Sequence, residues 1–250
     1  MGSTREVEVS IVIPVKDEAE NIDTLARELA AAMDRQPWSW ECIWVDDGSS
    51  DQSLAIIERL AETDPRHRFI SFGRNSGQSA AFRAGFMEAR GAILATMDGD
   101  GQNDPSDIPK LVEIIRSGRM DMANGYRARR QDNLARKLAS RIANGFRNAV
   151  TGKTVRDVGC STRAFKRECV ANLPNFKGMH RFLPTLVAMQ GFTLGELPVN
   201  HRPRLRGNSK YTINNRLWVG LVDTLGILWL RKRAFQYNIA KKSVNRLVDK

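Results

Sequence analysis

The sequence predicts an α/β fold with a mostly parallel central sheet flanked by helices. Over the first hundred residues, short runs rich in β-branched residues alternate with segments of helical spacing that are about ten residues long. Because parallel strands need a crossover between them, this alternation indicates βαβ units. The 250 residues, of which 42% are hydrophobic and 27% charged, are enough for one sizeable core and exclude a disordered chain.

Each element of this fold can be placed along the chain. The first strand is predicted at residues 9–15, VSIVIPV, an apolar run that ends in a polar turn. The helix that follows places Ile22, Leu25 and Leu29 on one face. Further strands are predicted at 42–45, 69–72 and 92–97, and further helices at 53–62 and around 80–87.

Acidic residues follow three of the predicted strands. They are Asp17 and Glu18, Asp46 and Asp47, and Asp98 and Asp100. In open α/β sheets ligands bind at the carboxyl ends of the strands, so this edge of the sheet is the predicted site. The sequence has no GxGxxG turn after the first strand and no GxxxxGK[ST] loop, which argues against a dinucleotide-binding fold and a P-loop.

The sharpest local signal is Asp98-Gly-Asp100-Gly-Gln102. The two carboxylates are one residue apart on a turn that leaves a buried strand, so their side chains project the same way. Two close carboxylates raise each other's pKa unless a cation lies between them. Hard oxygen ligands suit Mg²⁺ or Mn²⁺, which would share its coordination with substrate phosphates. The alternative is a solvated acidic loop, since Asp-Gly pairs are common in turns.

Three motifs in order carry a resemblance to a known family: VSIVIPVKDE at 9–18, VDDGSSD at 45–51 and MDGDGQ at 97–102. Over about residues 8–210 the chain resembles the family 2 glycosyltransferases of GT-A fold. It is most similar to the polyprenyl-phosphate glycosyltransferases, such as dolichyl-phosphate mannose synthase and its bacterial relatives. The resemblance implies metal-dependent, inverting transfer of a sugar from a UDP- or GDP-linked donor to undecaprenyl or dolichyl phosphate.

The resemblance also implies a role for individual donor-side residues. The nucleoside would be contacted by Pro14, Glu18 and Asp47. The Mg²⁺ or Mn²⁺ ion and the donor diphosphate would be held by Asp98, Asp100 and Gln102. The family often has an aromatic residue at the position of Lys16, which leaves the nucleobase, and the choice between UDP and GDP, open.

The acceptor-side residues lie in the second half of the chain. Arg127, in Gly-Tyr-Arg, matches the family's Gly-Ser-Arg and would contact the acceptor phosphate. The resemblance assigns the same phosphate to Arg136 and Ser140, which are four residues apart and share one helical face. Arg206 and Lys210 match a loop that closes over the donor and acceptor phosphates. Asp98, Asp100 and Arg127 are therefore the predicted catalytic residues.

Charge is divided unevenly along the chain. Residues 1–125 hold 13 Lys and Arg against 22 Asp and Glu, whereas residues 126–250 hold 26 against 6. A basic half suits a phosphate-bearing substrate or an anionic membrane surface. A sugar hydroxyl acceptor is the first alternative; it needs a catalytic base, for which Asp157 is the candidate. A nucleic-acid-binding protein is a more remote alternative, because no interleaved aromatic platform or reading module is visible.

The C-terminal segment suggests a membrane contact. Residues 217–230 are apolar, but at 1.5 Å per residue they reach only about 21 Å, short of a bilayer core of about 30 Å. Basic residues flank them at Arg216 and at 231–233. We therefore predict a GT-A domain at 1–210 and an amphipathic helical segment at 211–250 that lies on the cytoplasmic face of the plasma membrane. Three widely spaced cysteines fit a reducing compartment. A membrane partner protein is a hypothesis that no residue of the sequence supports.

Overall fold

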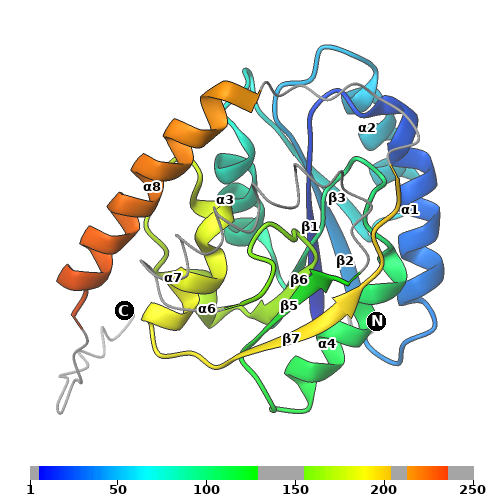
Figure 1. Cartoon of the computed structure of the whole chain (residues 1–250). Helices are drawn as coiled ribbons and strands as arrows, with labels where there is room; N and C mark the ends of the chain where they lie inside the picture. Colours follow the sequence, from blue (N-terminus) through cyan, green and yellow to red (C-terminus); the bar gives the residue numbers. More distant parts are fainter. Residues whose placement is uncertain (1–5, 129–154, 204–212, 236–250) are drawn as a thin grey trace, which may run out of the picture.

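The computed structural model describes residues 6–128, 155–203 and 213–235, with side chains from 222 onward in the last segment. Seven strands form one sheet in the order β3-β2-β1-β4-β6-β5-β7 (Figure 1). The strands are β1 Val9–Val15, β2 Trp40–Asp46, β3 His67–Ser71, β4 Ile93–Thr96, β5 Met122–Arg127, β6 Arg163–Lys166 and β7 Leu194–Val199. The expected α/β fold with a mostly parallel sheet is confirmed.

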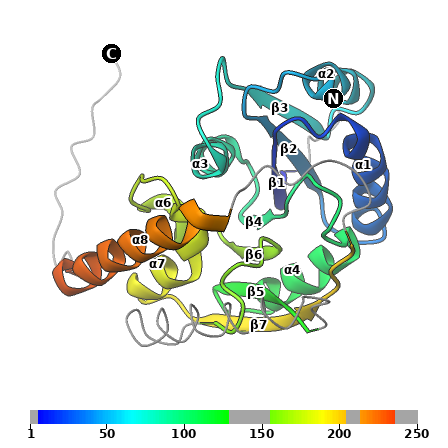
Figure 2. The same ribbon diagram turned by 45° about the horizontal axis from the view of Figure 1, so that its top comes forward.

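Helices cover both faces of the sheet (Figure 2). One side carries α1 Ala19–Met33, α2 Ser53–Thr63 and α4 Ile108–Arg116. The other side carries α3 Gln78–Glu88, α6 Glu168–Ala171, α7 Leu183–Met189 and α8 Ile213–Arg233. Short 3-10 turns lie at η1 Pro105–Asp107 and η2 Met179–Phe182.

The first helix shows why these residues form this layer. Its apolar positions recur at helical spacing, and Ile22, Leu25 and Leu29 are all buried against the sheet, as the sequence predicts. On the opposite face, α3 comes close to β1 because Gly85 has no side chain. A Cβ there would lie 2.2 Å from Cγ1 of Val12. The two faces thus pack tightly on β1, at the centre of the expected site.

The sheet departs from a purely parallel one at β6. The pairs β1–β2, β1–β4, β2–β3 and β5–β7 are parallel, whereas β6 is antiparallel to both β4 and β5. Antiparallel pairing places the first residue of β6, Arg163, opposite Thr96 at the end of β4 and opposite Asn124 of β5. Arg163 therefore lies between the strand that leads to Asp98 and the strand that ends at Arg127.

The last helix of the described chain, α8, runs along the outside of α6 and α7 (Figures 1 and 2). Thr224 and Ile227 are buried on the domain, whereas Val222, Leu225 and Trp229 are exposed. Basic residues end the helix at Arg231, Lys232 and Arg233. In the part of the chain that the structure covers, no helix is long and apolar enough to cross a membrane.

Candidate active site

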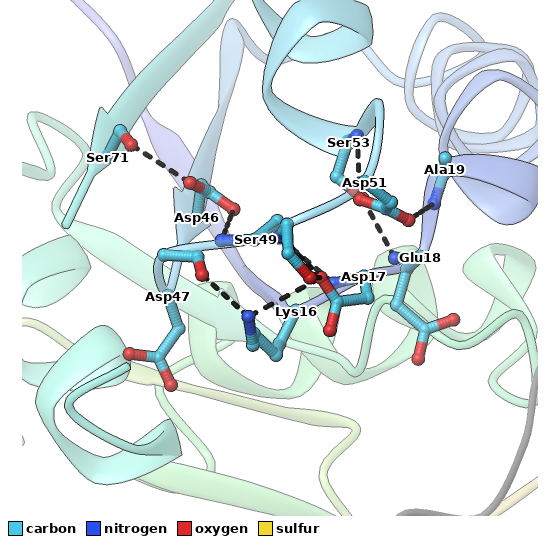
Figure 3. A network of polar contacts seen from close by, with 12 residues as sticks. Lys16, Asp17, Glu18, Ala19, Asp46, Asp47, Ser49, Asp51, Ser53 and Ser71 are labelled. Atoms are coloured by element: carbon cyan, nitrogen blue, oxygen red, sulfur yellow. Dashed lines mark hydrogen bonds and ion pairs between the residues drawn. The ribbon is translucent and has the colours of Figure 1, made fainter. Parts of the chain in front are cut away.

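The turns after β1 and β2 are joined by a network of polar contacts (Figure 3). The carboxylate of Asp17 accepts a 2.7 Å hydrogen bond from the amide of Ser50, and the amide of Asp17 donates to Oγ of Ser49 over 2.9 Å. Asp17 has a φ of +50°, a backbone conformation that is uncommon outside glycine. The network holds this residue in place and fixes the two turns relative to each other.

Lys16 belongs to the same network. Its Nζ donates a 2.6 Å hydrogen bond to the carbonyl of Gly48 and lies 3.4 Å from the carboxylate of Asp17. Gly48 has a φ of +66°, and a Cβ at this position would lie 2.7 Å from the carbonyl carbon of Arg74. The turn after β2 therefore requires glycine at position 48. The carbonyl of Gly48 orients Lys16, which stands where the family often has an aromatic residue.

The nucleoside-side candidates Pro14, Glu18 and Asp47 lie at the ends of β1 and β2. The carbonyl of Pro14 would be 3.0 Å from a Cβ on Gly99, so β1 adjoins the Asp98 turn. Glu18 accepts a 2.7 Å hydrogen bond from Asn21. Asp47 points away from the network in Figure 3. Its two oxygens accept hydrogen bonds from the amides at residues 76 and 77, which lead into α3.

Asp98 follows β4 and is held from two sides. Its Oδ1 accepts a 2.7 Å hydrogen bond from Nε2 of Gln78, the first residue of α3. Its amide donates to Oδ1 of Asn103 over 3.1 Å. Burial and the charge of Asp100 raise the pKa of Asp98, against the lowering effect of its hydrogen bonds and of Arg163.

The rest of this turn is tied to the segment after β7. Oδ1 of Asp100 accepts a 3.1 Å hydrogen bond from the amide of Gln102. The carbonyl of Gln102 accepts one of 2.8 Å from the amide of Arg202, and Nε2 of Gln102 donates to the Arg202 carbonyl over 3.4 Å. Arg202 also forms ion pairs with Glu28 and Asp104. The turn is therefore braced on both of its sides.

The donor atoms of this turn fit a hard divalent cation. Asp98 and Asp100 supply carboxylate oxygens whose mutual repulsion a cation would relieve. The amide nitrogen of Gln102 faces a carbonyl, which leaves its Oε1 as a ligand atom. Within the described residues no group of three His, Cys, Asp or Glu side chains is gathered for a metal.

On the acceptor side, the structure pairs Arg127 with Asp157. Nε of Arg127 donates to Oδ2 of Asp157 over 2.7 Å, and Nη2 donates to Oδ1 over 2.9 Å. The other acceptor candidates, Arg136, Ser140, Arg206 and Lys210, lie outside the described residues. Cys160 is buried, and burial raises the pKa of its thiol, which makes it a packing residue.

Three further residues of the site are absent from the sequence prediction. Gln78 reaches Asp98 from α3, and Asn103 binds the Asp98 amide and also donates to Oγ1 of Thr162 over 2.7 Å. Arg163 lies buried on β6. Asn103 directly follows the Asp98–Gln102 motif and could have been suspected from that position. Gln78 and Arg163 reach the site through contacts distant in sequence.

The α/β sheet with acidic turns at the ends of β1, β2 and β4 is the architecture of GT-A nucleotide-sugar transferases. The family model described as Glycosyl transferase family 2 matches residues 10–173. The chain belongs to this family.

Two similar sequences have been assigned activities. A dodecaprenyl-phosphate galacturonate synthase of Rhizobium johnstonii is 36% identical over 232 residues, which are 91% of this chain and 68% of that protein. An undecaprenyl-phosphate 4-deoxy-4-formamido-L-arabinose transferase of Pectobacterium carotovorum is 40% identical over 206 residues, 82% of this chain and 62% of that protein. The chain thus spans about two thirds of the length of these relatives.

Solved structures share the fold. Glucosyl-3-phosphoglycerate synthase from Mycobacterium tuberculosis, in complex with Mn²⁺, UDP and glucosyl-3-phosphoglycerate, superposes with a TM-score of 0.64 at 17% identity, over 90% of this chain and 80% of that one. Mannosyl-3-phosphoglycerate synthase from Rubrobacter xylanophilus gives a TM-score of 0.68 at 14% identity, over 95% and 79%. At these identities the likeness establishes the fold.

Proposed function

We propose that the protein transfers a sugar from a nucleotide-diphosphate sugar to a polyprenyl phosphate and forms a polyprenyl-phosphate-linked sugar. The observation that carries the proposal is the placement of two carboxylates and an arginine at the ends of two strands of one sheet, β4 and β5. Asp98 and Asp100 follow β4, and Arg127 ends β5, with only β6 between these strands. The named activities of the two sequence relatives, which both act on polyprenyl phosphates, support the same chemistry.

On the donor side, Asp98, Asp100 and Gln102 would hold Mg²⁺ or Mn²⁺ together with the donor diphosphate. The ion, when bound, neutralises charge on the leaving nucleoside diphosphate. The chain's own contribution is to keep the two carboxylates in place: Gln78 fixes Asp98, and the contacts of Gln102 with Arg202 fix the far side of the turn. Pro14, Glu18 and Asp47 would border the nucleoside.

On the acceptor side, Arg127 would bind the lipid phosphate, together with Arg136, Ser140, Arg206 and Lys210. A phosphate oxygen, already anionic at neutral pH, attacks the anomeric carbon as the bond to the diphosphate breaks, and the configuration inverts. Because the nucleophile carries its charge already, the step needs no strong general base. The arginines hold it in line for attack, which is a large source of rate.

Asp157 bears on the alternative acceptor, a sugar hydroxyl. That chemistry needs a carboxylate base near the acceptor. Both oxygens of Asp157 accept hydrogen bonds from Arg127, so the carboxylate faces an arginine and not an acceptor hydroxyl. The pairing therefore favours a phosphate acceptor, for which Asp157 orients an arginine and removes no proton.

We further propose that α8 lies against the cytoplasmic, anionic face of the membrane that holds the acceptor. Val222, Leu225 and Trp229 present an apolar surface to solvent, and three basic residues, 231–233, end the helix. An exposed apolar surface beside a basic cluster is typical of helices that lie in the bilayer interface. Each Lys or Arg near an anionic leaflet adds roughly 1 kcal/mol of binding.

The test is a donor screen on the purified protein. UDP- and GDP-sugars are offered with Mn²⁺ or Mg²⁺, with and without undecaprenyl phosphate in detergent. The proposal expects lipid-dependent release of one nucleoside diphosphate that EDTA abolishes, and this also names the sugar and the nucleotide. Release that depends on a sugar hydroxyl instead of the lipid would support the alternative acceptor.

A further inference from the structure

Arg163 is the first residue of β6 and has an exposed fraction of only 3%. Its antiparallel register places it between Thr96, two residues before Asp98, and Asn124, three residues before Arg127. Burial of a guanidinium costs several kcal/mol unless hydrogen bonds and nearby charges compensate. The contacts of Arg163 must therefore compensate for its burial, and they indicate its role.

The guanidinium binds three different segments of the chain. Nε donates to Oδ1 of Asn124 over 2.8 Å, Nη2 to the carbonyl of Val158 over 2.7 Å and Nη1 to the carbonyl of His180 over 2.9 Å. All three acceptors are neutral oxygens. Two carboxylates act on the charge of Arg163, that of Asp98 and that of Asp157, one from each side of the proposed site.

Each bond leads to a residue of the proposed site. Val158 adjoins Asp157, which holds Arg127, and Asn124 also donates to the Asp157 carbonyl over 3.1 Å. On the other side, Nδ1 of His180 lies 2.8 Å from Oγ of Ser79, and the neighbouring residue, Gln78, holds Asp98. Hydrogen bonds and the covalent links between them thus connect Asp98 to Arg127, and Arg163 lies in the middle of this path.

We infer that Arg163 is a positioning residue that fixes the acceptor-binding Arg127 relative to the donor-binding Asp98. The inference rests on the proposed function. The fork of the guanidinium is what matters, because a rigid donor set can hold three segments at defined angles. A lysine keeps the charge near Asp98 and Asp157, but it has a single nitrogen on a flexible stem and cannot reproduce the three directions.

The test compares Arg163→Lys with Arg167→Lys. Arg167 lies just beyond the other end of β6, is partly buried and binds the carbonyl of Gly91 with two nitrogens, so it is a matched arginine away from the site. For each variant the melting temperature, the Kd of UDP or GDP with Mn²⁺, and kcat/KM for undecaprenyl phosphate are measured. Ser79→Ala, a milder change that removes the contacts of this hydroxyl with His180 and with the amide of Gly178, serves as a second variant should Arg163→Lys fold poorly.

We expect Arg163→Lys to bind the nucleotide with Mn²⁺ within about twofold of the wild type, and to lose about 100-fold in kcat/KM for the lipid phosphate, as a misplacement of about 1 Å does. Ser79→Ala should show the same split on a smaller scale, and Arg167→Lys should show none. A kcat/KM of Arg163→Lys for the lipid phosphate within twofold of the wild-type value would overturn the inference. The inference would also be overturned if nucleotide binding and sugar transfer by Arg163→Lys both fell in proportion to the fraction of folded protein. Wild-type protein that transfers no sugar to the lipid would instead refute the proposed function itself.

Discussion

Arg127 and Asp157 face each other through two parallel hydrogen bonds of 2.7 and 2.9 Å, and the Arg127 amide adds a third to the same carboxylate at 3.3 Å. Both side chains are mostly buried, with 15% and 12% of their surface exposed. A bidentate pair of this kind fixes the plane of the guanidinium. Asp157 therefore sets the direction in which Arg127 presents its charge.

Substitutions of Arg127 and Asp157 distinguish the effect of the arginine's charge from the effect of its orientation. Arg127→Lys keeps the charge and loses the fork, so we expect KM for undecaprenyl phosphate to rise at least about tenfold with little change in nucleotide binding. Asp157→Asn removes the mostly buried carboxylate charge that faces the arginine and should lower the free energy of unfolding by about 3 kcal/mol. Steady-state kinetics and urea unfolding measure the two effects. Equal KM values for Arg127→Lys and the wild type would contradict the assignment of Arg127 to the acceptor.

Asp100→Asn tests the donor side. The change removes one of the two carboxylate charges of the turn and keeps its shape, so we expect kcat to fall by about 1,000-fold or more while the fold is retained. Circular dichroism and the donor assay measure the two properties. The matched control is Asp34→Asn, an acid outside the site that binds Trp40 and Arg66. Full activity of Asp100→Asn would remove the metal from the proposal.

Gly48→Ala tests the turn that carries Asp47. Its positive φ and the 2.7 Å approach to Arg74 leave no room for a methyl group. We expect the free energy of unfolding to fall by about 2 kcal/mol or more, measured in urea. Gly73→Ala is the control, because a Cβ there meets no atom within 4 Å, and it should change stability by less than about 0.5 kcal/mol. Equal effects of the two substitutions would contradict the described turn.

His180 should make stability depend on pH. Burial, with the charges of Arg181 and Arg163, lowers its pKa to about 3. In the unfolded chain the imidazole takes up a proton as pH falls through about 6.5, whereas in the folded protein it stays neutral until about pH 3. The contribution of the neutral His180 side chain to the free energy of unfolding is therefore complete above pH 6.5 and is lost as pH falls from 6.5 towards 3.

The measurement is urea unfolding of the wild type and of His180→Gln at pH 7 and pH 5. Between these values the wild type should lose about 2 kcal/mol more than the variant, from about 1.4 kcal/mol per pH unit below the unfolded pKa. The comparison at two pH values cancels the packing cost of the substitution. If the wild type and His180→Gln had the same pH dependence, folding would not lower the pKa of His180, and the imidazole would be protonated in the folded protein at pH 5.

The exposed face of α8 should bind lipid. Leu225→Ser combined with Trp229→Ser removes two apolar side chains, and we expect binding to vesicles of anionic phospholipid to weaken at least about tenfold. Met87→Ser is the matched control: Met87 and Trp229 are both 64% exposed, and Met87 belongs to α3. Vesicle sedimentation measures the difference. If the double variant bound the vesicles as tightly as the wild type, the exposed face of α8 would not be the membrane-binding surface.

The sequence predicted the first half of the fold in detail because its signals are local. The strand at 9–15 has the predicted bounds, and the helix from Ser53 differs by one residue at its end. The antiparallel strand β6 was not predicted, since four residues carry too little periodicity and their placement depends on pairing with β4 and β5.

The same distinction holds for the site. Asp98, Asp100 and Gln102 form one turn, so a motif contains them. The partner of Arg127 is 30 residues away in sequence, and Gln78 reaches Asp98 over 20 residues. The sequence offers Asp157 as a candidate base for a hydroxyl acceptor, and spacing does not reveal that it pairs with an arginine. Contacts of this kind appear only when strands and helices pack.

The insertion of β6 between β4 and β5 has a consequence for how the chain folds. β4 and β5 are not neighbours in the sheet, so among the described strands β5 and β7 are hydrogen-bonded to the first four through the four residues of β6. That junction pairs Thr96 with Arg163, which lie far apart in sequence, so its formation carries a larger chain-closure cost than the pairings among β1 to β4. We therefore expect β1 to β4 to form first and β5 and β7 to join them when β6 docks.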